Sequence, residues 1–255
     1  MLLAAWTLWT REIVRFYRQP SRLVGALGSP LLFWLLLGSG LGRSFRGEGS
    51  LRGGYLEYFY PGTLALIVLF TAIFSTVSVI EDRQEGFLQG VLVAPVPRLA
   101  IVLGKVLGSA TLALLQAAIF LLVAPLVYGG LSAVTLVSLV LILALLAFAL
   151  SGLGFLIAWT LESTQGFHAI MNLFLVPMWM LSGALFPASG ASGWVAALMW
   201  INPLTYGVSA LRHTIYGHAS AGEPSLVVSV LVVGVFGAAL LGLGAWYVRA
   251  DRSAA

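Results

Sequence analysis

The segment Gly190-Ala191-Ser192-Gly193 carries a residue type that can act as a nucleophile. A serine hydroxyl becomes reactive when a histidine lies beside it as a general base. His213 and His218 follow in the sequence, and both precede the last apolar stretch. An intramembrane serine hydrolase centred on Ser192 is therefore one hypothesis. A turn rich in glycine, serine and alanine is the alternative that we favour.

ATP chemistry would need a phosphate-binding loop of the form G-x-x-x-x-G-K-[ST]. The Gly104-Lys105 pair is the only Gly-Lys pair in the sequence. Leu99 stands where the first glycine is required, and Val106 stands where serine or threonine is required. We therefore expect that any ATP-driven work of this chain depends on a separate subunit.

Charged and apolar residues are combined in residues 81–98, EDRQEGFLQGVLVAPVPR. Gly86 separates four charged residues from the apolar run FLQGVLV, which is too short to cross a bilayer. Pro95 and Pro97 prevent the helix from continuing. The charged residues are Glu81, Asp82, Arg83 and Glu85.

Two interpretations of the apolar run remain open. A short helix parallel to the membrane would expose Phe87, Leu88 and Leu92 for docking to a partner protein. An ordinary loop would let the same side chains dip into the membrane interface.

The composition is that of a membrane protein. Hydrophobic residues make up 60% of the 255 residues, charged residues only 9%, and the mean hydropathy is +1.01. Continuous apolar runs predict helices rather than barrel strands, so we expect an all-α bundle forming one domain over residues 1–255. The predicted spans are 23–42, 57–80, 105–128, 131–159, 166–187 and 225–248.

The positive charges predict the orientation of these spans. With the N-terminus in the cytoplasm, nine positive residues fall on the inner side and four, including Arg212, on the outer side. We therefore expect both termini in the cytoplasm, and nucleic-acid binding has little support. Glu57 and Lys105 stand at span ends, so no charge is expected deep in the membrane, which argues against an ion-coupled carrier.

Residues 1–22 have the pattern of an amphipathic helix at the membrane interface. Aromatic residues gather on one side, and we expect Pro20 to end the helix. The arginines of the other side would reach lipid phosphates or a partner. They are Arg11, Arg15, Arg18 and Arg22.

Two connections complete the pattern. The turn at Tyr128-Gly129-Gly130 is short, so the spans on either side of it must be antiparallel neighbours. Residues 188–224 are too apolar for a solvated loop and too interrupted for a span, which predicts short re-entrant or interfacial helices on the outer side.

The segment EGFLQGVLVAPVPR, together with Asn202-Pro203-Leu204-Thr205-Tyr206 and Ala210-Leu211-Arg212, resembles the permease subunits of ABC type-2 exporters. The resemblance covers nearly the whole chain. It implies a homodimer of permeases on two ATPase subunits that bind ATP and Mg. Residues 85–97 would form the coupling helix, and residues 1–22 would form a connecting helix that also rests on the ATPase.

The resemblance implies roles for three sets of residues. The coupling set is Glu81, Asp82, Arg83, Glu85, Gly86, Phe87, Leu88, Val91, Pro95, Pro97, Arg11, Arg15 and Arg18, of which the acidic and basic residues of 81–85 would form ion pairs with the ATPase. The substrate path would include Phe70, Phe74, Asn172, Phe174, Met178 and Trp179, for which simple packing between helices is the alternative. The outer gate would include Asn202, Pro203 and Tyr206.

The resulting hypothesis is the permease subunit of an ATP-driven exporter of an amphipathic drug, lipid or lipid-linked glycan. We expect a bacterial inner-membrane location and no cofactor or metal bound by this chain. The alternatives are the serine hydrolase at Ser192 and a passive channel.

Overall fold

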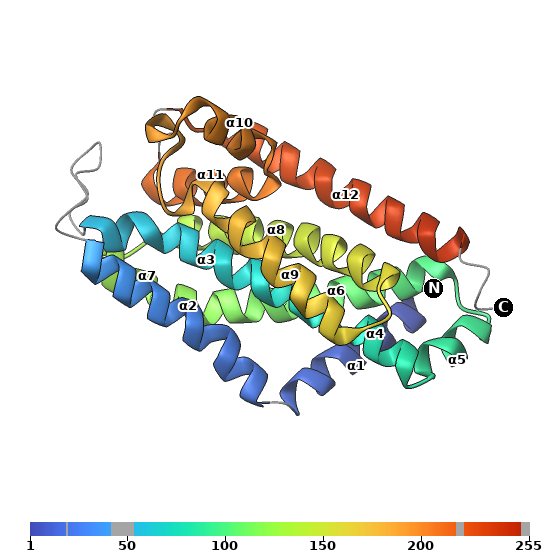
Figure 1. Cartoon of the computed structure of the whole chain (residues 1–255). Coiled ribbons are helices and arrows are strands. Elements are labelled where there is room, and N and C mark those ends of the chain that lie inside the picture. The colour runs from blue at the N-terminus through green and yellow to red at the C-terminus, as the bar shows by residue number, and fades with distance from the viewer. Residues whose placement is uncertain (19, 42–53, 218–221, 251–255) are drawn as a thin grey trace.

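The computed structural model describes residues 1–18, 20–41, 54–217 and 222–250, and every regular element among them is a helix (Figure 1). This confirms the all-helical prediction. The α-helices are α1 (Leu2–Tyr17), α2 (Pro20–Leu41), α3 (Gly54–Ser75), α4 (Ser78–Gln84), α5 (Phe87–Val93), α6 (Arg98–Leu121), α7 (Ala124–Tyr128), α8 (Ala133–Thr160), α9 (Thr164–Trp179), α10 (Gly193–Ile201), α11 (Pro203–Tyr216) and α12 (Leu226–Ala250). A π-helical turn, η1 (Met180–Ala184), follows α9, and a 3-10 turn, η2 (Ala188–Gly190), precedes α10.

Five helices in the described ranges are long and apolar enough to cross a membrane. They are Gly54–Gln84, which combines α3 and α4, and Arg98–Leu121, Ala133–Thr160, Thr164–Ala184 and Leu226–Ala250. The predicted first span, 23–42, coincides with α2 up to residue 41, and its apolar part Gly28–Gly40 is shorter than these five. A sixth span therefore stays a prediction.

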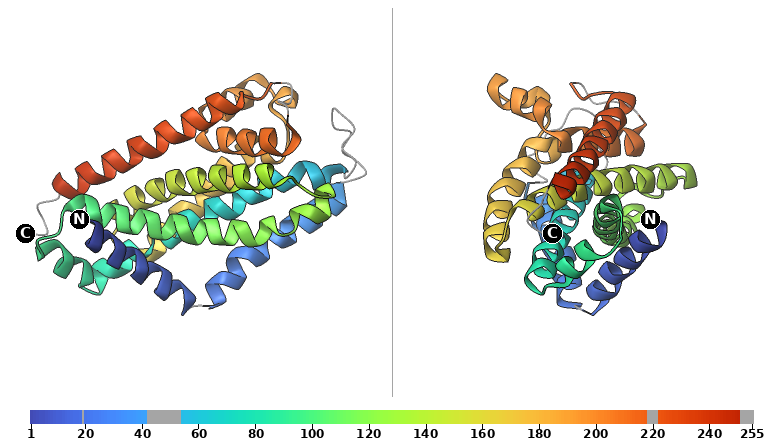
Figure 2. Two further views of the ribbon diagram at one scale, coloured as in Figure 1. Left: turned by 180° about the vertical axis from the view of Figure 1, so that it is seen from behind. Right: turned by 90° about the vertical axis from the view of Figure 1, so that its right-hand side faces the viewer.

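Helix α3 is the central helix of the bundle. It is apolar on all sides, and a helix of that kind needs neighbours all around it. It packs against α2, α6, α8 and α9, and residues such as Phe59, Leu64 and Ile67 have no exposed surface. Helices α6 and α8 pack against each other and run in opposite directions (Figure 2), which confirms the predicted antiparallel pair. Side chains of α3 therefore contact several surrounding helices at once.

The N-terminal helix ends earlier than predicted. Helix α1 ends at Tyr17, and Pro20 is the first residue of α2 rather than the end of α1. Proline is favoured at the first helical position because its fixed φ suits a helix and because the backbone N–H at that position, which proline lacks, has no hydrogen-bond partner within the helix. The break therefore precedes Pro20.

Small residues let α1 approach α6 closely. A Cβ atom added at Gly104 would lie 2.7 Å from Cβ of Leu8, and one added at Gly108 would lie 2.7 Å from Cβ of Glu12. Glycines four residues apart lie on one helix face and allow helix backbones to pack tightly. Helices α1 and α6 lie side by side (Figure 2). Their close packing brings Glu12 against the side of α6.

The two ends of the bundle differ in what they carry. The start of α1, the end of α12, α4 and α5 lie at one end, here called the α5 end, whereas α10 and α11 lie at the opposite end, here called the α10 end (Figures 1 and 2). The sequence segments that predict partner docking and outer gating are thus at opposite ends of the bundle.

Candidate functional site

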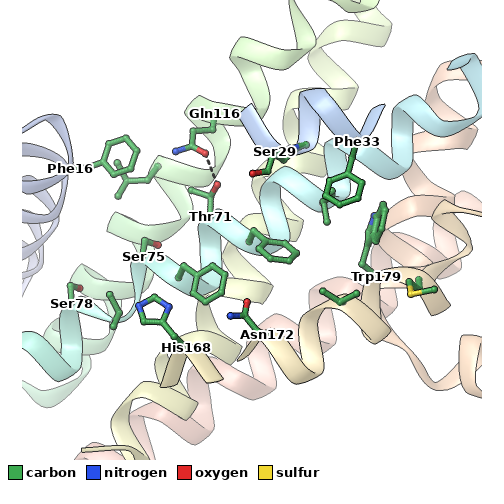
Figure 3. A pocket seen from close by; sticks show the side chains of 18 of the residues that line it. Phe16, Ser29, Phe33, Thr71, Ser75, Ser78, Gln116, His168, Asn172 and Trp179 are labelled. Atoms are coloured by element: carbon green, nitrogen blue, oxygen red, sulfur yellow. Dashed lines mark hydrogen bonds between the residues drawn. The ribbon is translucent and has the colours of Figure 1, made fainter. Parts of the chain in front are cut away.

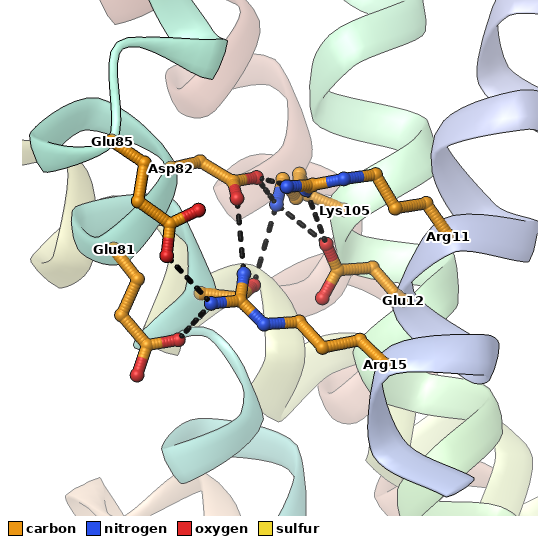
Figure 4. Close-up of polar contacts among 8 residues, drawn as sticks. Arg11, Glu12, Arg15, Glu81, Asp82, Glu85 and Lys105 are labelled. Carbon is orange, nitrogen blue, oxygen red and sulfur yellow. Dashed lines mark hydrogen bonds and ion pairs between the residues drawn. The ribbon is translucent and has the colours of Figure 1, made fainter. Parts of the chain in front are cut away.

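A buried cluster of charges, here called the charge cluster, holds α1, α4 and α6 together at the α5 end (Figure 4). Its central residue is Asp82 of α4, which has no exposed surface. Nη1 of Arg11 lies 2.6 Å from Oδ2 of Asp82, and Nη1 of Arg15 lies 3.0 Å from Oδ1. The ammonium group of Lys105 also binds Oδ2. The cluster comprises Arg11, Glu12, Arg15, Glu81, Asp82, Glu85 and Lys105.

Lys105 corrects the prediction that this residue stands at the end of a span. Helix α6 begins at Arg98, seven residues before the predicted span, so Lys105 lies two turns inside the helix with 2% of its surface exposed. Its Nζ is 2.5 Å from Oε1 of Glu12. A buried ammonium group is tolerated because two carboxylates share it, and removing the ammonium group would leave those carboxylates buried with less positive charge.

The cluster becomes solvent-exposed toward α5. Nη2 of Arg15 lies 2.8 Å from Oε2 of Glu81 and 3.5 Å from Oε1 of Glu85, and the Glu85 side chain is 58% exposed. The arginines were predicted to reach lipid phosphates or a partner. Arg11 and Arg15 instead bind acidic residues of their own chain, whereas Arg18 is exposed.

Arg83 is also directed into the protein. Its guanidinium donates hydrogen bonds to the carbonyl oxygens of Trp159 (2.7 Å) and Leu161 (3.2 Å) at the end of α8. A cation is favourable there because the last carbonyls of a helix are unpaired and carry partial negative charge. All four charged residues predicted to pair with a partner therefore have partners inside the chain, and of these Glu85 is the most exposed.

Helix α5 forms at the predicted apolar run. Gly86 precedes it with φ of 77°, a left-handed conformation that glycine adopts without strain, and this reverses the chain between α4 and α5. The prediction that Leu88 is exposed is wrong, because Leu88 packs into the core with 2% exposure, and Val91 and Leu92 are partly buried against it. The exposed surface of α5 and its flanks, here called the α5 surface, consists of Glu85, Gly86, Phe87, Gln89, Gly90, Val93, Pro95 and Pro97.

A cavity of about 750 Å³ lies beside α3, between α2 and α9 (Figure 3). Four of the predicted path residues line it, namely Phe70, Phe74, Asn172 and Trp179. The other two do not: Phe174 is 63% exposed on another face of α9, and Met178 packs against the core. Further lining residues that the sequence analysis missed are Phe33, Thr71, Gln116, His168 and Met180.

The two ends of the cavity differ in polarity. Figure 3 shows Ser78 and His168 toward α1 and α4, and Phe33 and Trp179 at the opposite end. The charge cluster adjoins the polar end, since Glu12 and Arg15 also line the cavity. The cavity is therefore an apolar site with polar groups concentrated toward the α5 end.

The helical segment formed by α9 and η1 is interrupted close to the cavity. Gly183 has φ of 80°, which breaks the helix inside η1 and releases backbone carbonyls from their regular bonds. Side chains of α3 and α11, with Asn202 just before α11, replace the lost donors. Each of these side chains donates to a backbone carbonyl oxygen. Asn202 donates to Met178 (2.6 Å) and Thr205 to Leu181 (3.3 Å). Arg212 and Tyr58 both donate to Gly183 (2.6 and 3.2 Å), and Tyr55 donates to Leu185 (3.1 Å).

Arg212 is the charged member of this arrangement, and it is 2% exposed. Its Nη1 lies 2.6 Å from Oε1 of Glu223, and its guanidinium stands 4.2 Å over the ring of Tyr58. Burial alone would lower the pKa of Arg212, but Tyr58 and Glu223 outweigh burial and the pKa is raised. Arg212 is thus a charged, paired residue of the interior rather than one of the outer-surface charges that predict orientation.

The predicted outer-gate residues lie at the α10 end, where the predicted re-entrant segment forms η2, α10 and α11. Asn202 accepts a hydrogen bond from the backbone N–H of Leu204 and so caps α11, and Pro203 occupies the first position of that helix. The hydroxyl of Tyr206 donates to the carbonyl of Trp200 at 2.9 Å. The location of these helices relative to a membrane stays a prediction.

The serine of the hydrolase hypothesis has no activating partner among the described residues. Ser192 is the residue immediately before α10, and its side chain makes no capping hydrogen bond. Nε2 of His213 lies 3.0 Å from the carbonyl oxygen of Pro224, and His218 falls outside the described residues. The described geometry therefore lacks the nucleophile and base pair that such a mechanism requires.

Comparisons with known proteins agree on one family. The chain is 28% identical to "Putative transport permease ycf38" of Cyanophora paradoxa over 82% of this chain and 73% of that protein. It is 27% identical to "Nodulation protein J" of Neorhizobium galegae over 83% and 80%, and 28% identical to "Probable multidrug ABC transporter permease YbhR" of Escherichia coli K12 over 60% and 42%. The model of the family described as "ABC-2 type transporter" matches residues 4–216, and the chain therefore belongs to the ABC-2 type transporter family.

Proposed function

We propose that this chain is the membrane-spanning permease of an ATP-driven exporter, with ATP and Mg bound by a separate ABC ATPase. The family membership and the missing phosphate-binding loop support this division of labour. One relative is described as a probable multidrug permease. The cargo is an amphipathic drug, lipid or lipid-linked glycan.

The observation that carries the proposal is the connection between the α5 surface and the cavity. Asp82 fixes α4 to α1 and α6, and α4 continues α3 within one apolar segment, Gly54–Gln84. Phe70 and Phe74 of α3 line the cavity. Displacement of α5 by a docked ATPase would therefore shift the cavity wall. Directional transport follows only if the two positions of the wall bind cargo with different affinity.

Two copies of the chain and two ATPases form the working assembly in this proposal. Phe33 of α2 is 51% exposed and Phe174 of α9 is 63% exposed, so exposed apolar side chains are present on both helices beside the cavity. A second copy would cover them and enclose the cavity. Both termini lie in the cytoplasm of a bacterial cell, α2 supplies the sixth span, and α10 and α11 gate release.

Reconstitution with and without the ATPase tests this function. We expect proteoliposomes that contain the permease, the ATPase and ATP to accumulate a lipophilic dye against its gradient, and permease alone to accumulate none. Uphill accumulation by permease alone would refute the proposal. Equilibration of the dye by permease alone would instead indicate a passive channel.

A further inference from the structure

The wall of the cavity contains a buried amide with an unused donor. Gln116 of α6 has no exposed surface, and its Oε1 accepts a hydrogen bond from Oγ1 of Thr71 at 2.6 Å. No partner is present for Nε2 among the described residues. Because an unpaired buried amide is unfavourable, a group that enters the cavity and accepts this hydrogen bond gains affinity.

The charged side chains of the wall are already paired. Among the described lining residues, Glu12 and Arg15 alone carry formal charge, and both belong to the charge cluster. The other described polar groups of the wall are hydroxyl, amide and imidazole groups such as those of Ser75, Asn172 and His168. A charged ligand would lose its hydration without gaining an unpaired opposite charge, which disfavours ions.

The size and the aromatic lining of the cavity restrict the ligand further. A volume of about 750 Å³ falls within the range of roughly 300 to 1,000 Å³ that sites for drug-sized molecules occupy. Phe33, Phe70, Phe74 and Trp179 supply flat apolar surfaces. These features fit one compact molecule better than a glycan chain.

We propose that Gln116 is the polar anchor of a binding site for a neutral, largely apolar, drug-sized molecule that carries a hydrogen-bond acceptor. Thr71 holds the amide in place by occupying its other end. The identification of this molecule as cargo rests on the proposed function. The binding site itself requires neither ATP nor the ATPase.

Three compounds with the same diphenyl skeleton test separately whether the ligand needs a hydrogen-bond acceptor and whether it must be neutral. Benzophenone is neutral and has a carbonyl acceptor, diphenylmethane lacks the acceptor, and 4-benzoylbenzoate adds a negative charge. Ultraviolet light attaches benzophenone covalently to nearby C–H bonds, so peptide mapping of the full chain in lipid nanodiscs reports where it binds. We expect saturable labelling of the peptides that contain Phe70 and Asn172. Competition gives the relative affinities of the other two compounds.

Two variants carry the test. In the native chain we expect benzophenone to bind about three- to tenfold more tightly than diphenylmethane, which is the gain from one neutral hydrogen bond. Gln116→Met keeps the shape of the side chain but removes the amide, and it should abolish this preference while leaving diphenylmethane affinity unchanged. Leu112→Ala alters the apolar wall alone, so it should weaken both compounds and preserve the preference.

The outcomes separate this inference from the proposed function. Loss of the preference in Gln116→Met, with weak competition by 4-benzoylbenzoate, supports the site even if reconstituted transport fails. A preference that survives Gln116→Met refutes the inference even if transport succeeds. Equal competition by 4-benzoylbenzoate also refutes it. Size-exclusion profiles and thermal unfolding of each variant confirm that the compared proteins are folded.

Discussion

Glu12 of α1 and Lys105 of α6 lie 93 positions apart in the sequence, and their carboxylate and ammonium groups are 2.5 Å apart in the interior. Lys105 is the only lysine of the chain. Because it binds Asp82 as well, a single ammonium group joins three helices at the α5 end.

Replacing this lysine should weaken the bundle more than its size suggests. Lys105→Met leaves Glu12 and Asp82 buried with less positive charge, and we expect the free energy of unfolding to fall by about 3 kcal/mol. Adding Glu12→Gln should recover part of the loss, because one uncompensated carboxylate is then removed. Denaturant titration of the four proteins of this cycle in mixed micelles measures the coupling. Strictly additive effects would contradict the ion pair.

The close packing of α1 on α6 predicts a second effect. Gly108→Ala places a Cβ 2.7 Å from Cβ of Glu12, so α1 must move outward, and we expect a loss of about 1 to 3 kcal/mol. Gly242→Ala is the matched control, since nothing lies within 4 Å of its added Cβ. The control should be neutral or stabilising, because alanine favours helices. Equal thermal midpoints for the two variants would disprove the tight contact.

Docking at the α5 surface can be tested at Val93, which is 81% exposed. Val93→Asp should leave the permease folded but prevent its association with the ATPase, because an unpaired charge would be buried at the interface. We expect at least a tenfold loss of ATP-driven transport and of co-purified ATPase. Val134→Asp makes the same change at a residue 77% exposed on α8. It should have no such effect, and equal losses in both variants would exclude a specific role for the α5 surface.

The interruption of α9 should depend on Arg212. Arg212→Met removes the donor to the Gly183 carbonyl and leaves Glu223 unpaired, so we expect a loss of about 3 kcal/mol. Glu223→Gln keeps a hydrogen-bonding partner for the guanidinium and should cost less. A thiol introduced by Met180→Cys reports the local structure, since the chain has no cysteine of its own. We expect faster maleimide labelling of this thiol when Arg212→Met is added, and an unchanged rate would contradict the capping role.

The proposed homodimer predicts a specific cross-link. Residue 174 lies on the exposed apolar face of α9 that a second copy would cover. We expect oxidation of the Phe174→Cys variant to give a disulfide-linked dimer on non-reducing gels. Leu231→Cys on α12 is the control, with 60% exposure against 63% for Phe174. It should stay monomeric. Cross-linking at both positions in equal yield would point to random collision instead.

The helices and the short α5 were predictable because long apolar runs and proline boundaries are local signals. Residues 87–93 form α5 between Gly86 and Pro95, as the spacing of these breakers indicates. The antiparallel α6 and α8 followed in the same way from the turn at Gly129. The start of α2 was missed, because Pro20 can either end a helix or begin one.

The interior partners were not predictable from local pattern. Lys105 was assigned to a span end because the apolar run begins after it, and only the approach of α1 and α4 shows why its charge is tolerated. Gln116 was overlooked, although a lone amide within the apolar run 105–128 was a usable signal. Arg212 was counted as an outer charge because its pairing with Glu223 and Gly183 depends on tertiary packing.

The attachment of Arg83 to the end of α8 has a mechanical consequence. Helix α4, which leads into α5, is attached on two sides. Asp82 binds it to α1 and α6, and Arg83 and Gln84 donate hydrogen bonds to carbonyl oxygens at and just beyond the end of α8, which packs against α12. A displacement of α5 would therefore act on two parts of the bundle, namely α1 and α6 through Asp82, and α8 through Arg83. In the proposed coupling, Arg83→Ala would weaken the attachment of α4 to α8 and leave the attachment through Asp82 intact, so a displacement of α5 would still reach the cavity wall but with smaller amplitude.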